Sequence, residues 1–217
     1  MATSTAQRVG IWVITGALVL GTLGGFLAMI LVPRNQAADQ AEITRISNEY
    51  QKEYEVYNQR MQAQADELST RYYDEFSPYQ SRVSSFNKDE VAELATEDLK
   101  IGETGEALTE ESTFTAYYLG WTPDGNVFDG SIEGEKLTSP ITVQPGMVIS
   151  GWTEGVVGMK VGGVRELTIP ADKAYGDQGS GDTIPANTPL KFVIMIIESP
   201  EVIEQPQIPQ ELLDAYQ

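Results

Sequence analysis

The pattern of apolar and polar positions sets the first part of the chain apart from the rest. Residues 9–32 form an uncharged run, VGIWVITGALVLGTLGGFLAMILV, between Arg8 and Arg34. A helix of about 24 residues is roughly 36 Å long, which exceeds a hydrocarbon core of about 30 Å. We therefore expect a transmembrane anchor at 9–32 that contacts membrane lipid, after a short N-terminal tail at 1–8. A cleavable signal peptide is the alternative, because small residues follow near Ala37.

The orientation of this anchor is predicted from size rather than from charge. Arginines flank both ends, so the positive-inside rule does not decide. Because the tail at 1–8 is short and the chain beyond the anchor is long, we expect a single-pass protein of the cell membrane with its C-terminal domain outside the cytoplasm. Gly21 and Gly25 have the small-xxx-small spacing of some helix dimers, but lipid-facing glycine is the commoner explanation.

Residues 35–78 show a different periodicity, in which apolar and aromatic residues recur with spacings of three, four and four. The stripe consists of Ile43, Ile46, Tyr50, Tyr54, Tyr57, Met61, Ala65, Leu68, Tyr72 and Phe76. An eleven-residue repeat keeps these positions on one helical face, so we expect a helical stalk that Pro78 ends. The stripe is rich in tyrosine and poor in leucine. A coiled-coil homodimer and a stalk that packs on its own globular domain both stay open, and a linker at 79–96 follows.

From residue 97 to 200 the pattern changes to short β-rich runs separated by turn residues. The predicted strands are STFTAYYLGW, VFDGS, SPITVQ, VRELTIP and PLKFVIMII, and WTEGVVGMKVGG at 152–163 is the short amphipathic helix. Antiparallel strands with one helix over one sheet face make an α+β domain. The tail at 201–217 is spaced by prolines, and we expect it to be extended, with a short helical turn near its end.

Composition excludes many kinds of chemistry. The 217 residues contain no Cys and no His, and 14 Lys and Arg stand against 32 Asp and Glu, which gives a net charge of -18. Catalytic triads that need His or Cys and thiolate or imidazole metal sites are therefore excluded. We expect no metal and no cofactor. A strongly acidic chain offers no basic surface for phosphates, so we expect no nucleic-acid partner.

The residues of the globular region carry a specific resemblance. The run VISGWTEGVVGMKVGGVRELTIPADKAYGDQGSGDTIPANTPLKFVIMI, preceded by YYLGWTPDGNVFDGS, resembles the FKBP family of peptidyl-prolyl cis-trans isomerases. The likeness spans nearly all of 97–200, through a tyrosine strand, G-x-V-F-D, V-I-x-G-W, G-M-K-x-G and A-Y-G with I-P-x-N. It implies an antiparallel FKBP-like sheet wrapped on one short helix, behind the predicted anchor and stalk.

The resemblance also implies roles for single residues. Trp152 corresponds to the floor of the family's proline pocket, and Tyr118, Phe128 and Phe192 to its walls. Asp129 would lie beside the twisting amide, Tyr175 would donate its hydroxyl to a substrate carbonyl, and Ile149 would offer its backbone N–H. Val148, Ile184 and Ile141 complete the implied set of substrate contacts. Ile141 stands where the family usually has an aromatic residue, and Ser180 where the loop often has an aromatic residue or histidine.

The implied chemistry agrees with the composition. Rotation about an Xaa-Pro bond is opposed by amide resonance, and an apolar site that removes water from the amide needs no nucleophile and no titrating base. We expect an isomerase that helps exported or membrane-associated proteins to fold, with proline-containing polypeptides as substrates and macrolide inhibitors of the family as ligands. The alternative is a catalytically weak, membrane-tethered binding module, which the substitutions at Ile141 and Ser180 favour.

Overall fold

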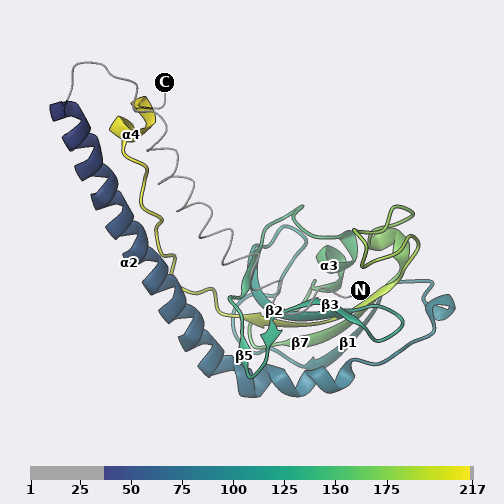
Figure 1. Ribbon diagram of the computed structural model, residues 1–217. Helices are drawn as coiled ribbons and strands as arrows, with labels where there is room; N and C mark the ends of the chain where they lie inside the picture. The colour runs from purple at the N-terminus through teal and green to yellow at the C-terminus, as the bar shows by residue number, and fades with distance from the viewer. Residues whose placement is uncertain (1–36, 216–217) are drawn as a thin grey trace. The chain divides into compact units, whose positions relative to one another are not determined.

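The computed structural model describes residues 37–215 (Figure 1), so the predicted anchor at 9–32 lies outside the described residues. A search of the described part of the chain finds no helix with the length and apolar character needed to cross a membrane. The chain divides into two units. The larger unit, Asn58–Ile203, holds the whole sheet, and the smaller unit combines residues of the first half of helix α2 with the C-terminal tail.

Antiparallel strands form the main sheet of the larger unit, in the order β1-β7-β8-β2-β3, with β6 also paired to β2. The strands are β1 (Ala95–Lys100), β2 (Phe114–Trp121), β3 (Val127–Gly130), β6 (Ile141–Val143), β7 (Val164–Ile169) and β8 (Leu190–Ile197), while β4 (Ile132–Glu133) and β5 (Lys136–Leu137) form a separate hairpin. β2 and β8 pair along most of their length, from Thr115 opposite Ile197 to Trp121 opposite Lys191. The α+β class and the antiparallel sheet that the sequence predicts are therefore present.

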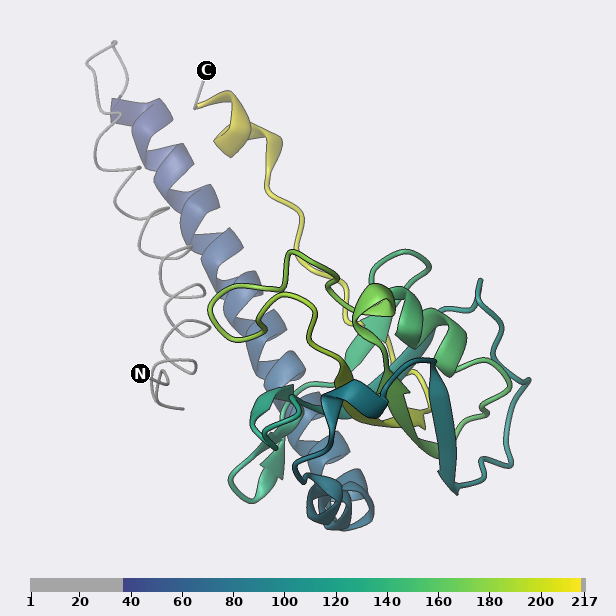
Figure 2. The same cartoon turned by 90° about the vertical axis from the view of Figure 1, so that its right-hand side faces the viewer.

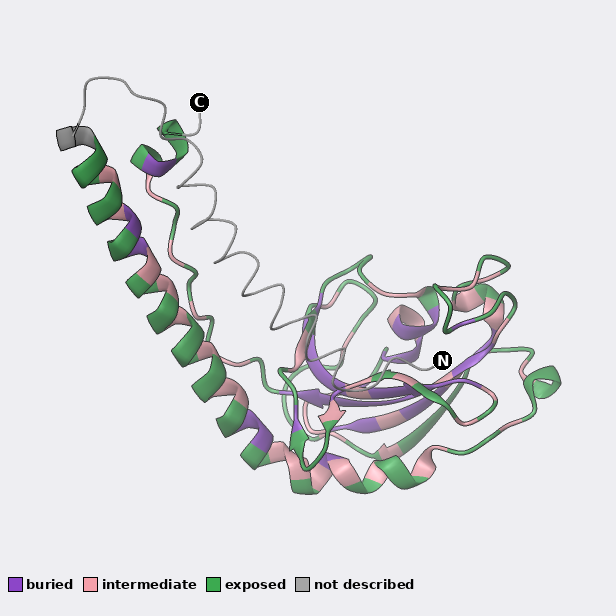
Figure 3. Cartoon of the chain, viewed as in Figure 1, coloured by how far each residue is buried: buried purple, intermediate pink, exposed green. Residues whose placement is uncertain are grey.

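The two central strands are buried on both faces, and Figure 3 shows them almost wholly buried. Alternate residues of β8 enter two separate clusters: Phe192 and Ile194 point to one face, and Val193 and Met195 to the other. Strands covered on both faces read as continuous apolar runs rather than as alternating ones. The run FVIMII in β8 has this form, so both faces of the sheet need a cover.

Helix α3 (Ser150–Gly155) covers the first face. The prediction of a helix at 152–163 is wrong in its limits. The chain leaves the helix after Gly155, reaches a positive φ of 83° at Gly158, and forms a β-bridge from Val161 to Thr104. Glycine is the residue that adopts this conformation without strain, so Gly158 ends the helical region before the predicted Gly162-Gly163 pair.

The second face is covered by the segment that precedes the sheet. It consists of the last turns of α2 (Ala37–Phe76), the 3-10 helix η1 (Ser77–Arg82) and the residues up to Phe86. Both views show η1 and α3 on opposite sides of the sheet (Figure 1 and Figure 2). Phe76 is fully buried, and its ring lies 6.3 Å from that of Tyr117. Of the two alternatives for the apolar stripe, residues 72–76 adopt packing on the chain's own domain.

The residues predicted as a linker, 79–96, are also part of this cover. Tyr79, Val83 and Phe86 pack against the second cluster, and the Trp121 indole donates a hydrogen bond to the Ser84 carbonyl at 3.1 Å. A second short 3-10 helix, η2 (Lys88–Glu90), then leads into β1, which is an edge strand. The segment thus covers the second face of the sheet and then leads into its edge strand β1.

An ionic network fastens the cover to the sheet. The Glu166 side chain, only 6% exposed on β7, accepts from Arg82 Nε at 2.7 Å and from Lys191 Nζ at 2.8 Å. Arg82 also pairs with Glu97 of β1. Because a buried carboxylate is costly without partners, Glu166 requires both cations. Arg82 therefore links η1 to two strands.

The tail after β8 is extended before a short helix, α4 (Gln210–Asp214). Within the larger unit, Gln64 Nε2 of α2 donates to the Glu201 carbonyl at 2.8 Å, and Arg71 lies 3.9 Å from Glu198. In the smaller unit, Leu212 of α4 is buried. The short helical turn expected near the end of the tail is present.

Candidate functional site

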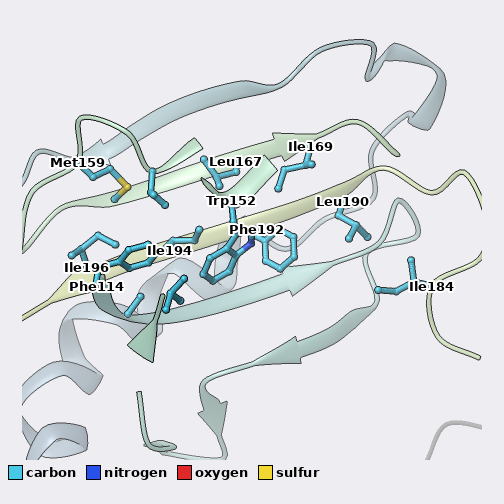
Figure 4. Packing of buried hydrophobic residues seen from close by; sticks show 13 residues of the cluster. Phe114, Trp152, Met159, Leu167, Ile169, Ile184, Leu190, Phe192, Ile194 and Ile196 are labelled. Atoms are coloured by element: carbon cyan, nitrogen blue, oxygen red, sulfur yellow. The ribbon is translucent and has the colours of Figure 1, made fainter. Parts of the chain in front are cut away.

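An aromatic cluster lies where α3 meets the first face of the sheet. The Trp152 ring centroid is 5.3 Å from that of Phe192 and 5.4 Å from that of Tyr118, both edge-on, and Phe128 meets Phe192 at 5.6 Å. Figure 4 shows Trp152 and Phe192 next to each other within the surrounding aliphatic side chains. Trp152 and Phe192 are buried, whereas Tyr118 and Phe128 are half-buried. Edge-to-face packing of this kind holds rings in defined orientations.

Two glycines make this arrangement sterically feasible. A side chain at Gly120 of β2 would place its Cβ 2.5 Å from the Phe192 ring, so only glycine leaves room for that ring. A Cβ at Gly155 would lie 2.7 Å from Leu167, so glycine also lets α3 approach the sheet. Arg165 then donates to the carbonyls of Gly155 and Val157 at 2.8 and 2.9 Å, which satisfies acceptors at the C-terminal end of α3.

Polar groups stand at the edge of the aromatic cluster. The Tyr118 hydroxyl donates to Asp129 Oδ2 at 2.7 Å, and the Gly130 amide donates to Asp129 Oδ1 at 2.9 Å. Asp129 is itself exposed. One carboxylate is therefore held at the border between the apolar cluster and solvent.

Electrostatics keep the neighbouring hydroxyls protonated. Burial raises the pKa of Tyr118 well above its ordinary value, and the hydrogen bond to Asp129 and the charge of Asp129 add to the shift. Burial also raises the pKa of Tyr175, with the Asp129 charge as the second cause. Because a phenol with a raised pKa stays neutral, both side chains can donate hydrogen bonds at any physiological pH.

A backbone donor completes the site. Ile149 precedes α3 with φ -58° and ψ 149°, and its carbonyl accepts from the amides of Trp152 and Thr153. Its own N–H has no acceptor within the described part of the chain. Ile149 is half-buried against the core of the first face, and its N–H can donate to a bound molecule.

The other predicted apolar residues belong to the hydrophobic core of the first face, which also contains Trp152 and Phe192. Ile184 is buried in it, and Val148, Ile149 and Ile141 are half-buried against it. Ile141 lies in β6 opposite Ala116. Ser180 pairs with Ile184 through two backbone hydrogen bonds of 2.8 and 3.1 Å, and this bridge closes the loop there.

One residue with a role at the site was not found from sequence. The Ser131 hydroxyl accepts from the Tyr118 amide at 3.0 Å, while the Ser131 amide donates to the Tyr118 carbonyl at 2.8 Å. Ser131 is almost fully buried and fixes the backbone from which the Tyr118 side chain projects. The signal was its place directly after VFDG, but a serine at the end of a strand reads as an ordinary turn residue.

Comparison with known proteins bears on this site. Residues 104–197 match the family model for FKBP-type peptidyl-prolyl cis-trans isomerase, and this range holds every predicted site residue. An FK506-binding protein of Neisseria meningitidis serogroup A is 39% identical over 108 residues, which are 50% of this chain and 97% of that protein. The chain belongs to the FKBP-type peptidyl-prolyl cis-trans isomerases.

Two further proteins are similar to this chain. A protein of Haemophilus influenzae called a probable FKBP-type peptidyl-prolyl cis-trans isomerase is 36% identical over 94 residues, 43% of this chain and 38% of that protein. A crystal structure of a peptidyl-prolyl cis-trans isomerase from Pseudomonas syringae has 32% identity and a TM-score of 0.43, and covers 56% of this chain and 88% of that one.

This FKBP-type chain is therefore a peptidyl-prolyl cis-trans isomerase, and FKBP-type isomerases in general bind proline-containing substrates and macrolides. The family match begins at residue 104, after β1 and after the whole cover of the second face. In residues 37–215, no group of three or more carboxylates is placed to hold a metal ion. The groups at the aromatic cluster are buried rings, the hydroxyl of Tyr118 and the carboxylate of Asp129.

Proposed function

We propose that the cluster of Trp152, Tyr118, Phe128 and Phe192 receives the substrate proline, and that this isomerase acts on exported or membrane-associated proteins from a membrane anchor. The observation that carries the first part is the contact of Trp152 with both Tyr118 and Phe192, next to the Tyr118–Asp129 hydrogen bond. Val148, Ile184 and Ile141 would border the same proline.

The proposed mechanism follows from the physics of the amide. A planar Xaa-Pro amide is stabilised by resonance, which gives a barrier of roughly 18–20 kcal/mol. The twisted transition state is less dipolar than the planar ground state, so an apolar environment favours it relative to water. The buried rings of Trp152 and Phe192 would supply that environment.

Orientation would come from the polar groups. The Ile149 N–H and the Tyr175 hydroxyl would each donate to a substrate carbonyl and keep the flanking peptide still while the prolyl bond rotates. Asp129 would hold the Tyr118 hydroxyl in place and present its charge beside the rotating amide. No proton would leave the protein in this cycle, so the rate should vary little with pH near neutrality.

The experiment that tests the site uses the full chain in detergent. Cis-to-trans relaxation of a proline-containing tetrapeptide is followed with and without a macrolide inhibitor of the family. We expect acceleration that the inhibitor abolishes, and a lower rate for Asp129→Ala in a protein that unfolds at the same denaturant concentration as the parent. An Asp129→Ala protein of full activity would show that the site is placed wrongly.

The membrane setting is a separate part of the proposal, and it is supported by the uncharged run at 9–32. In cells, the full chain should sediment with membranes after alkaline carbonate treatment, whereas a chain without residues 9–32 should not. Protease added to intact cells should cut the isomerase domain. Protection of that domain until the cells are lysed would place it in the cytoplasm and contradict the exported-protein substrates.

A further inference from the structure

Helix α3 presents two different faces to its surroundings. Trp152 points into the aromatic cluster, whereas Ser150 and Glu154, four residues apart, share another face of the helix. This second face contacts the 3-10 helix η3 (Ala171–Lys173), which the chain forms shortly before Tyr175.

Both residues of that face hold the same partner. Glu154 forms an ion pair with the Lys173 side chain, and the Ser150 hydroxyl donates to the Lys173 carbonyl at 3.4 Å. Lys173 is therefore attached to α3 through its side chain and through its main chain. This double attachment fixes the end of η3 with respect to the helix that carries Trp152.

Tyr175 follows Lys173 by two residues and lies in a turn. The residues on either side of Tyr175 are both hydrogen-bonded to the start of η3. The amides of Ala174 and Gly176 donate to the Ala171 carbonyl at 3.1 and 2.8 Å. The Tyr175 side chain is 38% exposed, so packing alone does not hold it. Beyond it the chain enters a loop with positive φ at Gly176, Gly179 and Gly181, and the Gly179 amide donates to the Tyr175 carbonyl at 3.2 Å. The loop thus holds the Tyr175 main chain from one side, and η3 connects it to α3 from the other.

We propose that Glu154 and Lys173 are positioning residues that set the place of the Tyr175 hydroxyl relative to α3. Through that hydroxyl they determine the affinity of the enzyme for the residues that flank the substrate proline. This inference rests on the proposed role of Tyr175 as a donor to a substrate carbonyl. Glu154 and Lys173 do not touch the substrate. They connect the helix under the proline to the segment that holds the neighbouring peptide.

The ion pair is well suited to a test, because its side chains are 38% and 33% exposed. Pairs at this exposure contribute little to stability, so an effect on substrate binding can be separated from unfolding. Lys100 and Glu75 form a comparable pair, 47% and 35% exposed, between β1 and the end of α2. Lys100→Met thus provides a matched control that removes an ion pair away from the aromatic cluster.

The experiment measures kcat and KM of the full chain with a proline tetrapeptide. We expect Glu154→Gln and Lys173→Met each to raise KM about two- to fivefold with kcat nearly unchanged. The weakened hydrogen bond from Tyr175 to the substrate carbonyl would be lost equally from the ground state and the transition state. Lys100→Met should leave both constants at the parent values. The charge-exchanged double variant, Glu154→Lys with Lys173→Glu, should recover most of the affinity.

A second series asks whether the effect passes through Tyr175. In a Tyr175→Phe background, Glu154→Gln should cause no further rise in KM, since there is no hydroxyl left to position. A full additional rise would overturn the inference. If Tyr175→Phe raises KM while Glu154→Gln and Lys173→Met do not, the positioning role alone fails. If Tyr175→Phe has no effect, the proposed donor role of Tyr175 fails, and the positioning role fails with it.

Discussion

Tyr117 and Tyr118 are neighbours in β2, yet their side chains enter two different environments. Tyr118 lies on the face covered by α3, where it is half-buried and its hydroxyl donates to Asp129. Tyr117 lies on the face covered by α2 and η1, where it is fully buried among rings. Its hydroxyl has no hydrogen-bond partner within residues 37–215.

The same contrast holds for Trp121 and Trp152. Trp152 stands under the predicted proline site, while Trp121 is enclosed on the opposite face and donates to the Ser84 carbonyl. One face combines buried rings with exposed polar groups at its edge, and the other is sealed by rings and an ionic network. Both faces are apolar, and they differ in that only the face under α3 keeps donors and a carboxylate accessible at its border.

The largest expected effect separates the two faces by stability. Phe76 is fully buried in the cover and contacts the rings of Tyr117 and Tyr79. Phe76→Ala should lower the free energy of unfolding by about 3–5 kcal/mol, because it leaves a cavity between α2 and the sheet. Urea unfolding measures this loss, and kcat/KM of the folded fraction should stay near the parent value.

The control for this substitution lies on the same helix. Val56 is 54% exposed, and Val56→Ala should change the unfolding free energy by less than about 0.5 kcal/mol. If Phe76→Ala were as mild as Val56→Ala, the cover would contribute little to the fold. The sheet would then have to tolerate one open apolar face.

The next effect compares Trp152→Leu with Trp121→Leu. Both remove a buried indole and should lower stability by about 1–3 kcal/mol. Trp152→Leu should in addition reduce kcat/KM about ten- to a hundredfold, because the rings around it lose their arrangement. Trp121→Leu should keep kcat/KM within about twofold of the parent, since it lies across the sheet from the site.

Cis-to-trans relaxation at a temperature well below both melting points makes this comparison fair. Equal losses of activity in the two variants would mean that the two faces are coupled through the sheet. Full activity of Trp152→Leu would instead remove the tryptophan from the site.

These differences between the faces could be predicted only in part from the sequence. The β-rich runs predict β2, β3, β6, β7 and β8, and the eleven-residue spacing predicts the long helix, because both signals are local. Strand β1 is not among the predicted runs. The four rings of the aromatic cluster come from four separate elements, β2, β3, α3 and β8. Taken singly, Trp152 and Phe192 have the pattern of core residues, and only their joint spacing in a known family brought them together.

Packing of the stalk on the second face is one of two alternatives that the sequence leaves open, although the strands carry a further signal for it. FTAYYLGW and LKFVIMII are continuous apolar runs, which indicates strands buried on both sides. The segment that covers such strands can lie anywhere in the chain, so the pattern within the strands does not identify it. The tyrosine-rich end of the stalk could pack on a second helix or on a sheet, and periodicity alone does not distinguish them.

The limits of α3 were missed for a backbone reason. The stretch 152–163 has an amphipathic pattern, but Gly158 turns at positive φ and Gly162 donates its amide to Ile196 of β8. Residues 161–162 therefore form hydrogen bonds with the sheet region in place of helical ones. The β4–β5 hairpin was missed in a similar way, because the Leu137 amide is satisfied by Ser69 of α2 across a long sequence separation.

The smallest expected effect concerns the hydroxyl of Tyr117. Tyr117→Phe should leave the unfolding free energy at pH 7 unchanged or raise it by up to about 1 kcal/mol, because a buried hydroxyl without a partner costs free energy. Tyr118→Phe should lower it by about 1 kcal/mol, because that variant loses a hydrogen bond to a carboxylate. Denaturant titrations of the two variants beside the parent measure this difference in sign.

Alkaline pH sharpens the same test. Burial, and next the neighbouring Tyr72, raise the pKa of Tyr117 well above its ordinary value. The unfolded chain therefore loses this proton near pH 10, while the folded chain keeps it. Its contribution is complete below pH 10 and is lost as pH rises toward the folded pKa, at about 1.4 kcal/mol per pH unit. Tyr117→Phe should flatten the fall in stability above pH 10 by that amount, and an unchanged slope would show that Tyr117 ionises in the folded chain as it does in the unfolded one.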